Sequence, residues 1–344
     1  MRLKALMGGL SVAIGCLVAA NAWAGGELTV VSWGGALQEA ERKAWFEPVA
    51  QELGITVKED TVNGIADVRA QVQSGSVTWD LVELGSNSCV KLAEEGAVEK
   101  LDLSMIDTAN IDPGLINDYW VGNLVFATVL AWNTKTYGDK QPESWADMWD
   151  FEKFPGGRSM YRKPYYNLEA ALMAAGVAPK DLYPLDVDLA FEQLEKMRPH
   201  IITWWPSGAA SAQLIRDGEV DMLNIWNGRV QAAIADGAEA NLTFNQQLLD
   251  FDCMVIPKGA PNKDLAMKVL AKFLTPEYQA RLPLHINYGP VNVKAFESPE
   301  ITPEMSAGLP SSPENAAKAA LFNPIWWSQH MDELQQRFDL FVQE

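Results

Sequence analysis

The sequence has few of the residues from which enzymes and nucleic-acid-binding proteins build their sites. Its 344 residues include three cysteines, three histidines and only 27 lysines and arginines against 45 acidic residues, a net charge of −18. Because nucleic acids and anionic membranes attract basic surfaces, this acidic excess argues against either as a general partner. The length is comfortable for two domains, and no repeat or low-complexity tract argues against a folded chain.

Common catalytic motifs are also missing. The sequence contains no phosphate-binding loop, dinucleotide fingerprint, metalloprotease motif or nucleophile elbow, and His200, His285 and His330 are isolated from one another. We therefore expect no enzyme, no cofactor and no metal. Two cleft carboxylates could still serve a secreted glycan hydrolase. Asp250 and Asp252 are a poor pair for that chemistry, because we expect them to point to opposite faces of a strand.

The N-terminus has the pattern of an export signal. Arg2 and Lys4 precede the uncharged apolar stretch 5–20, and Ala22-Trp23-Ala24 forms a site for signal peptidase. The sequence therefore predicts a signal peptide over 1–24 and a periplasmic protein. No later segment reaches the roughly 18 consecutive apolar residues of a transmembrane helix.

Two cysteines remain after this segment, Cys89 and Cys253. An oxidising compartment permits a disulfide between them. Their spacing fits no metal-binding or redox motif, and two buried free thiols are the interpretation we favour.

Strand-like and helix-like patterns alternate along the chain, which is typical of parallel sheets flanked by helices. A long β-prone run at 118–133 is expected to carry the chain from one lobe to another. The other expected strands lie at 27–33, 55–62, 79–84, 201–205, 220–226 and 250–257. Helices are expected at 36–47, 63–74 with Asn63 as cap, 143–149, 167–175, 188–197, 262–274 and 328–342, and from 209 and 227.

These patterns predict an α/β fold of two lobes joined by crossing strands, with a ligand cleft between the lobes. The first lobe is expected to contain residues 25–130 and about 258–310, and the second 131–257 and the C-terminal helix, about 325–344. Ligands of open α/β sheets bind outside the carboxyl ends of the strands. The turns after Trp33, Leu84 and Trp226 are therefore the first places to look.

Several motifs, in order along the mature chain, resemble one protein family. They are VVSWGG at 30–35, WDLV at 79–82, PESWADMWD at 142–150, IWNGR at 225–229, DFDCMVIPK at 250–258 and NYGPVN at 287–292. The chain resembles the spermidine/putrescine-binding family of periplasmic solute receptors, and its motifs are closest to the γ-aminobutyrate-binding branch. The resemblance implies a type II periplasmic binding protein that closes on a small ligand and delivers it to the permease subunits of an ABC importer.

The resemblance also implies a pocket of aromatic walls with charged ends, which suits an alkyl ammonium ligand. In that pocket Asp252 would bind an ammonium group, and Glu169 falls near a second family carboxylate. Aromatic walls would come from Trp33, Trp226 and Tyr288, and small polar contacts from Ser86 and Asn87.

Arg229 departs from the polyamine receptors. A polyamine has only positive ends, so an arginine in the pocket would repel it, whereas an arginine opposite Asp252 suits a ligand with one carboxylate and one ammonium group. The sequence thus predicts a short ω-amino acid such as γ-aminobutyrate or 5-aminovalerate. Putrescine or spermidine is the alternative, with Arg229 turned toward solvent or paired with Asp250 or Asp252.

Each of these residues also has an ordinary structural interpretation. Trp33 and Trp226 could be core residues, Tyr288 a structural tyrosine, and Ser86 and Asn87 caps of the following helix. We expect a monomer without nucleic-acid partners. The sequence does not separate delivery to a permease from presentation to a chemosensory protein.

Overall fold

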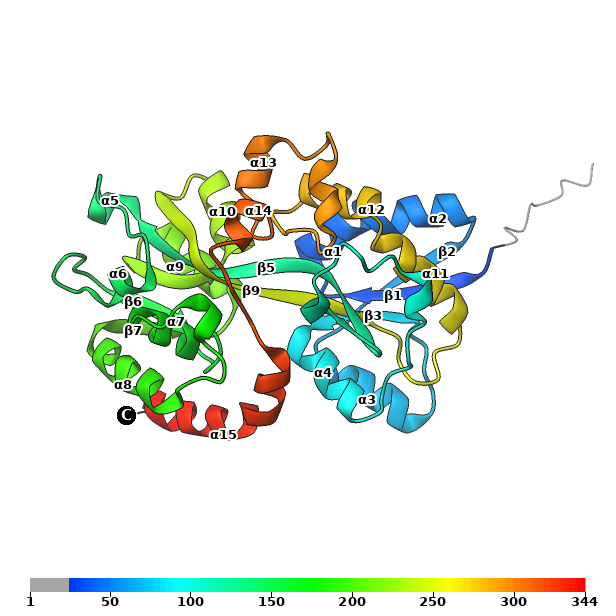
Figure 1. The fold of residues 1–344 in the computed structure, drawn as a ribbon, viewed down its shortest axis with the longest axis horizontal. Helices are drawn as coiled ribbons and strands as arrows, with labels where there is room; N and C mark the ends of the chain where they lie inside the picture. Colours follow the sequence, from blue (N-terminus) through cyan, green and yellow to red (C-terminus); the bar gives the residue numbers. More distant parts are fainter. Residues whose placement is uncertain (1–24, 344) are drawn as a thin grey trace, which may run out of the picture.

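The protein has two lobes that lie side by side and are joined by long strands (Figure 1). The structure is a computed structural model that describes residues 25–343. The expected signal peptide over 1–24 lies outside the described residues. Within the described part of the chain, no helix is long and apolar enough to cross a membrane.

The strands and helices alternate through most of the chain. The strands are β1 (Glu27–Ser32), β2 (Thr56–Thr61), β3 (Leu81–Gly85), β4 (Ile116–Asn117), β5 (Trp120–Asn133), β6 (Arg158–Tyr161), β7 (Ile201–Trp205), β8 (Met222–Trp226), β9 (Ala240–Val255) and β10 (Ala320–Leu321). The helices are α1 (Gly35–Glu41), α2 (Glu47–Leu53), α3 (Ile65–Ser74), α4 (Ser86–Glu94), α5 (Thr134–Tyr137), α6 (Trp145–Trp149), α7 (Asn167–Ala174), α8 (Val187–Met197), α9 (Gly208–Asp217), α10 (Asn227–Ala235), α11 (Lys263–Phe273), α12 (Pro276–Arg281), α13 (Pro303–Ala307), α14 (Pro313–Ala316) and α15 (Pro324–Gln343). A π-helical turn, η1 (Arg42–Phe46), joins α1 to α2.

One sheet runs through both lobes in the order β2-β1-β3-β9-β5-β8-β6-β7. The first lobe contains the parallel strands β1, β2 and β3, and the second contains the parallel strands β6, β7 and β8. The long strands β5 and β9 lie between these two sets and are antiparallel to their neighbours. The expected crossing run at 118–133 is therefore β5, and the predicted two-lobed α/β architecture is confirmed.

Strand register places the carboxyl ends of the two parallel sets close together. At the end of β3, Gly85 pairs with Asp252 of β9. At the end of β8, Trp226 pairs with Thr128 of β5, which in turn pairs with Leu248 of β9. Strands β3 and β8 run in opposite directions on the two sides of the β5–β9 pair. Their carboxyl ends therefore lie near positions 248–252 of β9.

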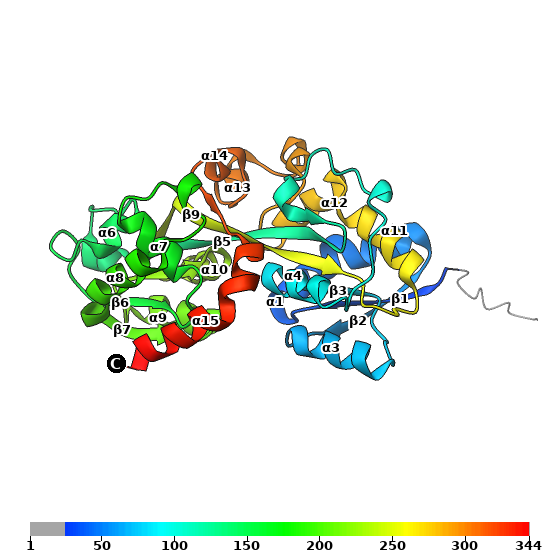
Figure 2. The ribbon, with the colours of Figure 1, turned by 60° about the horizontal axis from the view of Figure 1, so that its bottom comes forward.

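One large hydrophobic cluster fills the first lobe and continues through Ile225 of β8 and Val230 and Ala233 of α10, a second cluster fills the rest of the second lobe, and β5 and β9 contribute to both. The C-terminal helix α15 links the lobes along one edge (Figure 2). Near its start, Ser328 donates a hydrogen bond to Glu94 of α4 at 3.0 Å. Farther along, Phe338 and Phe341 pack against Trp204 of β7. Helix α15 therefore contacts elements of both lobes.

Most expected elements are present. Strand β6 was not expected from the sequence, and two expected details also differ. Strand β9 begins at Ala240, well before the expected 250, because its first part pairs with the far end of β5. Asn63 does not cap α3: Gly64 is the N-cap, with φ at +142°, and Asn63 instead donates its backbone N–H to Asp67 at 2.7 Å. Helix α2 ends at Gly54, which has φ at +63°, a left-handed conformation that favours glycine.

The expectation of two free thiols is wrong. Cys89 of α4 and Cys253 of β9 form a disulfide, and both residues are buried. Strands β3 and β9 are paired, and Leu84, a few residues before Cys89, lies opposite Cys253. Their separation of 164 residues in the sequence concealed this proximity.

Candidate functional site

The meeting point of the strand ends brings the predicted site residues together from both lobes. Trp33 follows β1, while Ser86 and Asn87 begin α4 directly after β3. Trp226 ends β8, and Arg229 lies in the first turn of α10. Asp252 lies on β9, between the residues from the first lobe and those from the second. This arrangement is expected for a ligand site between two lobes.

Asp252 is bound by Trp33, whose indole N–H donates to Oδ2 of the carboxylate at 3.1 Å. Asp252 is largely buried, whereas Trp33 is 38% exposed. In the described residues no lysine or arginine pairs with Asp252. Trp33 is therefore not a core residue, and Asp252 is not an ion-pair partner.

The expectation that Asp250 and Asp252 point to opposite faces of their strand is wrong. Residues two apart in a strand lie on the same face, because the side-chain period of a strand is two. The charge of Asp250 accordingly acts on Asp252. Asp250 accepts hydrogen bonds from Ser86 Oγ at 2.7 Å and Tyr166 Oη at 2.6 Å.

Ser86 and Asn87 do not cap α4 with their side chains. The N-cap is Gly85, with no side-chain hydrogen bond, and Ser86 donates to Asp250 instead. The buried Oδ1 of Asn87 has no hydrogen-bond partner among the described residues. A donor on an entering ligand could supply the missing partner.

Aromatic side chains form the wall of the site on the second-lobe side. The ring of Trp226 lies 6.4 Å from that of Phe126, 5.6 Å from Tyr161 and 5.4 Å from Trp205, centre to centre. Tyr288 extends this wall, with its ring 6.2 Å from Phe126. Such walls suit the methylene groups of an alkyl ligand.

Three further aromatic residues contact the predicted site residues or Asp250 and were not expected from the sequence: Phe126, Tyr161 and Tyr166. Tyr161 ends β6 just as Trp226 ends β8, so the rule that identified Trp226 would have identified Tyr161 had β6 been expected. No pattern in the sequence indicated Tyr166, because its link to the site is the hydrogen bond to Asp250, 84 residues away.

Arg229 is exposed and makes no ion pair in the part of the chain that the structure describes. It therefore does not pair with Asp250 or Asp252. A Cβ atom added to Gly208 would lie 2.8 Å from Arg229 Nε and 2.7 Å from the Trp226 ring, so both side chains cover the start of α9. The absent side chain at Gly208 leaves the space that they fill.

Tyr288 lies within the electrostatic reach of both charged ends of the site. Burial raises the pKa of Tyr288 to about 12; the positive charge of Arg229 lowers it, and the negative charges of Asp252 and Glu83 raise it. The positive charge of Arg229 and the negative charge of Asp252 therefore both act on this one hydroxyl.

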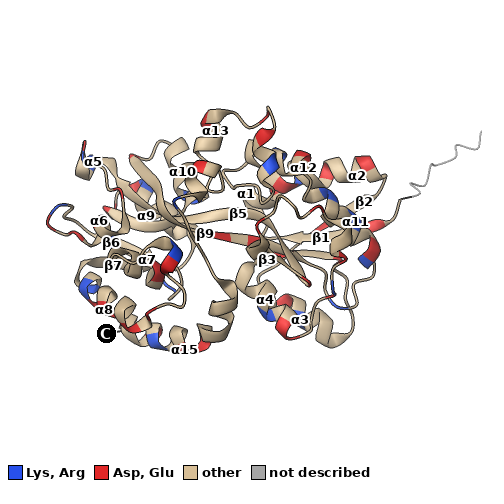
Figure 3. Ribbon diagram, viewed as in Figure 1, with Lys and Arg blue, Asp and Glu red and all other residues tan. Residues whose placement is uncertain are grey.

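Burial dominates the electrostatics of the carboxylates. It raises the pKa of Asp250 to about 6, although hydrogen bonds from Tyr166 and Ser86 lower it. Burial also raises the pKa of Asp252 well above its ordinary value, with further increases from the charges of Glu83 and Asp250. Negative charge concentrates near the middle of β9, between the two lobes (Figure 3). No cation among the described residues acts on Asp252, and a ligand could supply one.

Glu169 contacts residues of the second lobe and of α15, and its second carboxyl oxygen, Oε2, is buried without a hydrogen-bond partner among the described residues. It is fully buried on α7, and its Oε1 accepts hydrogen bonds from Tyr183 Oη and from Trp327 Nε1 of α15, each at 2.6 Å. These bonds attach the C-terminal helix to the second lobe.

The contacts of Glu169 predict a specific dependence of stability on pH. Burial raises its pKa to about 7 from an ordinary 4.5. A raised carboxyl pKa favours the folded state at low pH, so this contribution is complete below about pH 4.5 and is lost as pH rises toward 7. Glu169→Gln keeps the acceptor and removes the titration. The free energy of unfolding of the wild type, relative to this variant, should fall by up to roughly 3 kcal/mol over that range in urea titrations. A constant difference between the two proteins would contradict the assignment.

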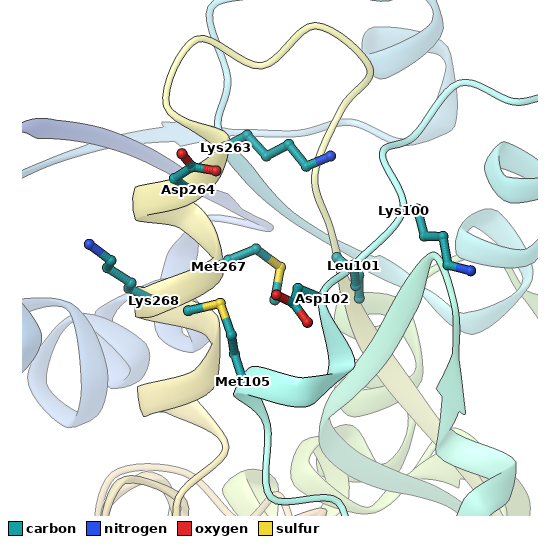
Figure 4. Close-up of a pocket in the computed structure, with 8 residues that line it drawn as sticks. All are labelled: Lys100, Leu101, Asp102, Met105, Lys263, Asp264, Met267 and Lys268. Atoms are coloured by element: carbon teal, nitrogen blue, oxygen red, sulfur yellow. The ribbon is translucent and has the colours of Figure 1, made fainter.

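A separate cavity of about 570 Å³ lies on the surface of the first lobe, between α11 and the segment around Asp102 (Figure 4). Lysine and aspartate side chains and two methionines, Met105 and Met267, line it. None of the predicted site residues is among its lining residues. The cavity is therefore not the cleft described above. In the described residues no group of histidine, cysteine and carboxylate side chains could hold a metal ion.

The fold and the cleft between its lobes define the chain as a type II periplasmic binding protein. Residues 44–308 match the family described as bacterial extracellular solute-binding protein, and the chain belongs to that family. The family suggested by the sequence motifs is thus confirmed. By its family the chain is a solute-binding protein.

Three similar proteins illustrate the relationship. The γ-aminobutyric acid-binding protein of Pseudomonas aeruginosa is 35% identical over 322 residues, which cover 92% of this chain and 90% of that protein. An ABC transporter substrate-binding protein from Bradyrhizobium japonicum USDA 110 is 46% identical, with a TM-score of 0.88 and coverage of 92% and 99%. MotA from A. tumefaciens B6, solved in complex with glucopine, is 40% identical, with a TM-score of 0.82 and the same coverage. The predicted likeness to the γ-aminobutyrate branch is confirmed by the first of these.

Proposed function

We propose that this protein is the periplasmic receptor of an ABC importer for a short ω-amino acid such as γ-aminobutyrate or 5-aminovalerate. The position of Arg229 carries the proposal, because this arginine lies in the first turn of α10, three residues after Trp226, makes no ion pair among the described residues, and acts on Tyr288 by its charge as Asp252 does. A ligand with a carboxylate for Arg229 and an ammonium group for Asp252 satisfies both ends. The relative that binds γ-aminobutyric acid supports this choice.

The proposed contacts follow from the side chains in the cleft. Asp252 takes the ammonium group, while Trp33, Trp226 and Tyr288 enclose the methylene groups. Ser86 and Asn87 provide polar contacts at the start of α4. Glu169 supports the second lobe through α15. We keep the lobes proposed from the sequence, residues 25–130 with about 258–310, and 131–257 with about 325–344.

Closure of the lobes is the proposed mechanism. Ligand contacts from both lobes favour the closed form, which the two membrane subunits of the permease would recognise. The export signal at 1–24 supports a periplasmic location, and we propose a monomer.

Small-angle X-ray scattering tests this proposal directly. Saturating γ-aminobutyrate should lower the radius of gyration, because the lobes approach each other, and succinate should not. Closure with putrescine and none with γ-aminobutyrate would replace this proposal by the polyamine receptor. The aromatic wall favours that second candidate only if Arg229 turns away from the bound ligand.

A further inference from the structure

Two glutamates lie buried in the first lobe next to Asp252, and the proposed ligand contacts do not use them. Glu41 of α1 and Glu83 of β3 both have no exposed surface. Ser32 Oγ donates to Glu83 Oε2 at 2.6 Å, and Asn123 Nδ2 donates to Oε1 at 2.6 Å. The charge of Glu83 acts on Asp252. We call Glu41, Glu83 and Asp252 the carboxyl cluster.

Glu41 lacks a hydrogen-bond donor. Neither of its carboxyl oxygens has a donor among the described residues, and its neighbours are the Glu83 carboxyl and Ser32, whose hydroxyl is already donated to Glu83. Two ionised carboxylates can only accept hydrogen bonds. A proton on one of the two carboxyl groups provides the missing donor and removes one of two buried like charges.

Among the described residues, no cation near the cluster could replace this proton. Asp250 adds another negative group from β9, and Tyr288 faces the cluster from the segment after α12. Arg42, next to Glu41 in sequence, is held by Glu39 and Glu59 at the surface. Arg229 reaches Tyr288, but the groups that shift the pKa of Glu83 and Asp252 include no positive charge.

We propose that binding of the ligand's ammonium group at Asp252 releases a proton from the carboxyl cluster to solvent. This inference rests on the proposed function. The ammonium group keeps its own protons; an O–H bond in the cluster breaks, the electron pair stays on the carboxylate, and water or buffer takes the proton. The bound cation then supplies the positive charge that the proton supplied before. The consequence is an affinity that rises with pH, by up to about tenfold per pH unit for one proton.

The raised pKa values agree with this geometry. Burial, and then the charge of Glu83, raise the pKa of Glu41 well above its ordinary value, and burial raises the pKa of Glu83. The free protein therefore retains a proton in the cluster at a pH where an exposed glutamate has lost it.

Calorimetric titration with γ-aminobutyrate in two buffers of different ionisation enthalpy, phosphate and Tris, measures the released protons. The wild type should release close to one proton near neutral pH. Glu41→Gln keeps the shape and supplies a permanent amide donor, so it should bind γ-aminobutyrate and release far less. Glu314→Gln removes a carboxylate from an 81% exposed position and should behave as the wild type.

The outcomes separate the two proposals. Tight binding with a heat that is independent of the buffer overturns proton release and leaves the proposed function in place. Absence of binding in both buffers overturns the proposed function and this inference with it. If Glu41→Gln does not fold, infrared difference spectra of the wild type decide: a protonated-carboxyl band should disappear when γ-aminobutyrate binds, and its persistence contradicts the proposal.

Discussion

Replacement of Arg229 by alanine should lower the affinity for γ-aminobutyrate by well over tenfold. The variant leaves the ligand carboxylate buried on closure without a charged partner, and truncation of one member of a buried charge pair typically costs 2–5 kcal/mol. The same change should raise the affinity for putrescine, because it removes a cation that repels the second ammonium group. Calorimetry with both ligands measures the two effects.

A matched control is available on the neighbouring helix. Arg216 lies at the end of α9 away from the cleft, and its guanidinium group is 3.5 Å from Asp236. Arg216→Ala makes the same change of charge in the same lobe and should leave both affinities unchanged. Equal affinities of wild type and Arg229→Ala for γ-aminobutyrate would remove Arg229 from the site.

Removal of the disulfide should cause the largest loss of stability. Cys89 and Cys253 close a loop of 164 residues. In the chain-entropy account, a cross-link over so long a loop stabilises the folded state by about 5 kcal/mol, although measured effects are often smaller. The double variant Cys89→Ala, Cys253→Ala should therefore unfold at a clearly lower urea concentration, with a loss of roughly 3–5 kcal/mol.

The disulfide also joins two parts of the site. Cys89 lies in α4 close to Ser86 and Asn87, and Cys253 follows Asp252 in β9. The double variant should thus also bind γ-aminobutyrate more weakly. The single variant Cys253→Ala also lacks the cross-link but loses less buried volume than the double variant. If the cross-link is the main cause of the lost stability, both variants should unfold at nearly the same urea concentration. An unchanged urea midpoint would show that the cross-link contributes nothing to stability.

Local patterns in the sequence were sufficient to predict much of the fold. Alternating strand and helix signals located β1, β3, β7 and β8 close to their observed positions, because each is a short buried run followed by a turn or a helix start. The site residues at the strand ends followed from the rule that ligands bind at carboxyl ends, and strand register places the ends of β3 and β8 beside the part of β9 that contains Asp252.

Features that depend on distant parts of the chain could not be predicted in this way. Three contacts join residues far apart in sequence: the Cys89–Cys253 disulfide, the hydrogen bond from Tyr166 to Asp250 and the hydrogen bond from Trp327 to Glu169. Glu83 carried a usable local signal, since a glutamate inside the apolar strand WDLVEL is unusual unless it has buried partners. The shared face of Asp250 and Asp252 was also predictable, from the two-residue period of a strand.

The central claim is that the cleft recognises one carboxylate and one ammonium group at opposite ends of a short alkyl chain. Calorimetric titration with γ-aminobutyrate, putrescine and succinate tests it most directly, because these ligands have chains of four carbon atoms and differ in their end groups. The account predicts tight stoichiometric binding of γ-aminobutyrate and binding at least about a hundredfold weaker for the other two ligands. Putrescine places an ammonium group against Arg229, and succinate places a carboxylate against Asp252. Putrescine binding as tight as that of γ-aminobutyrate would show that Arg229 does not face the ligand and would contradict the account.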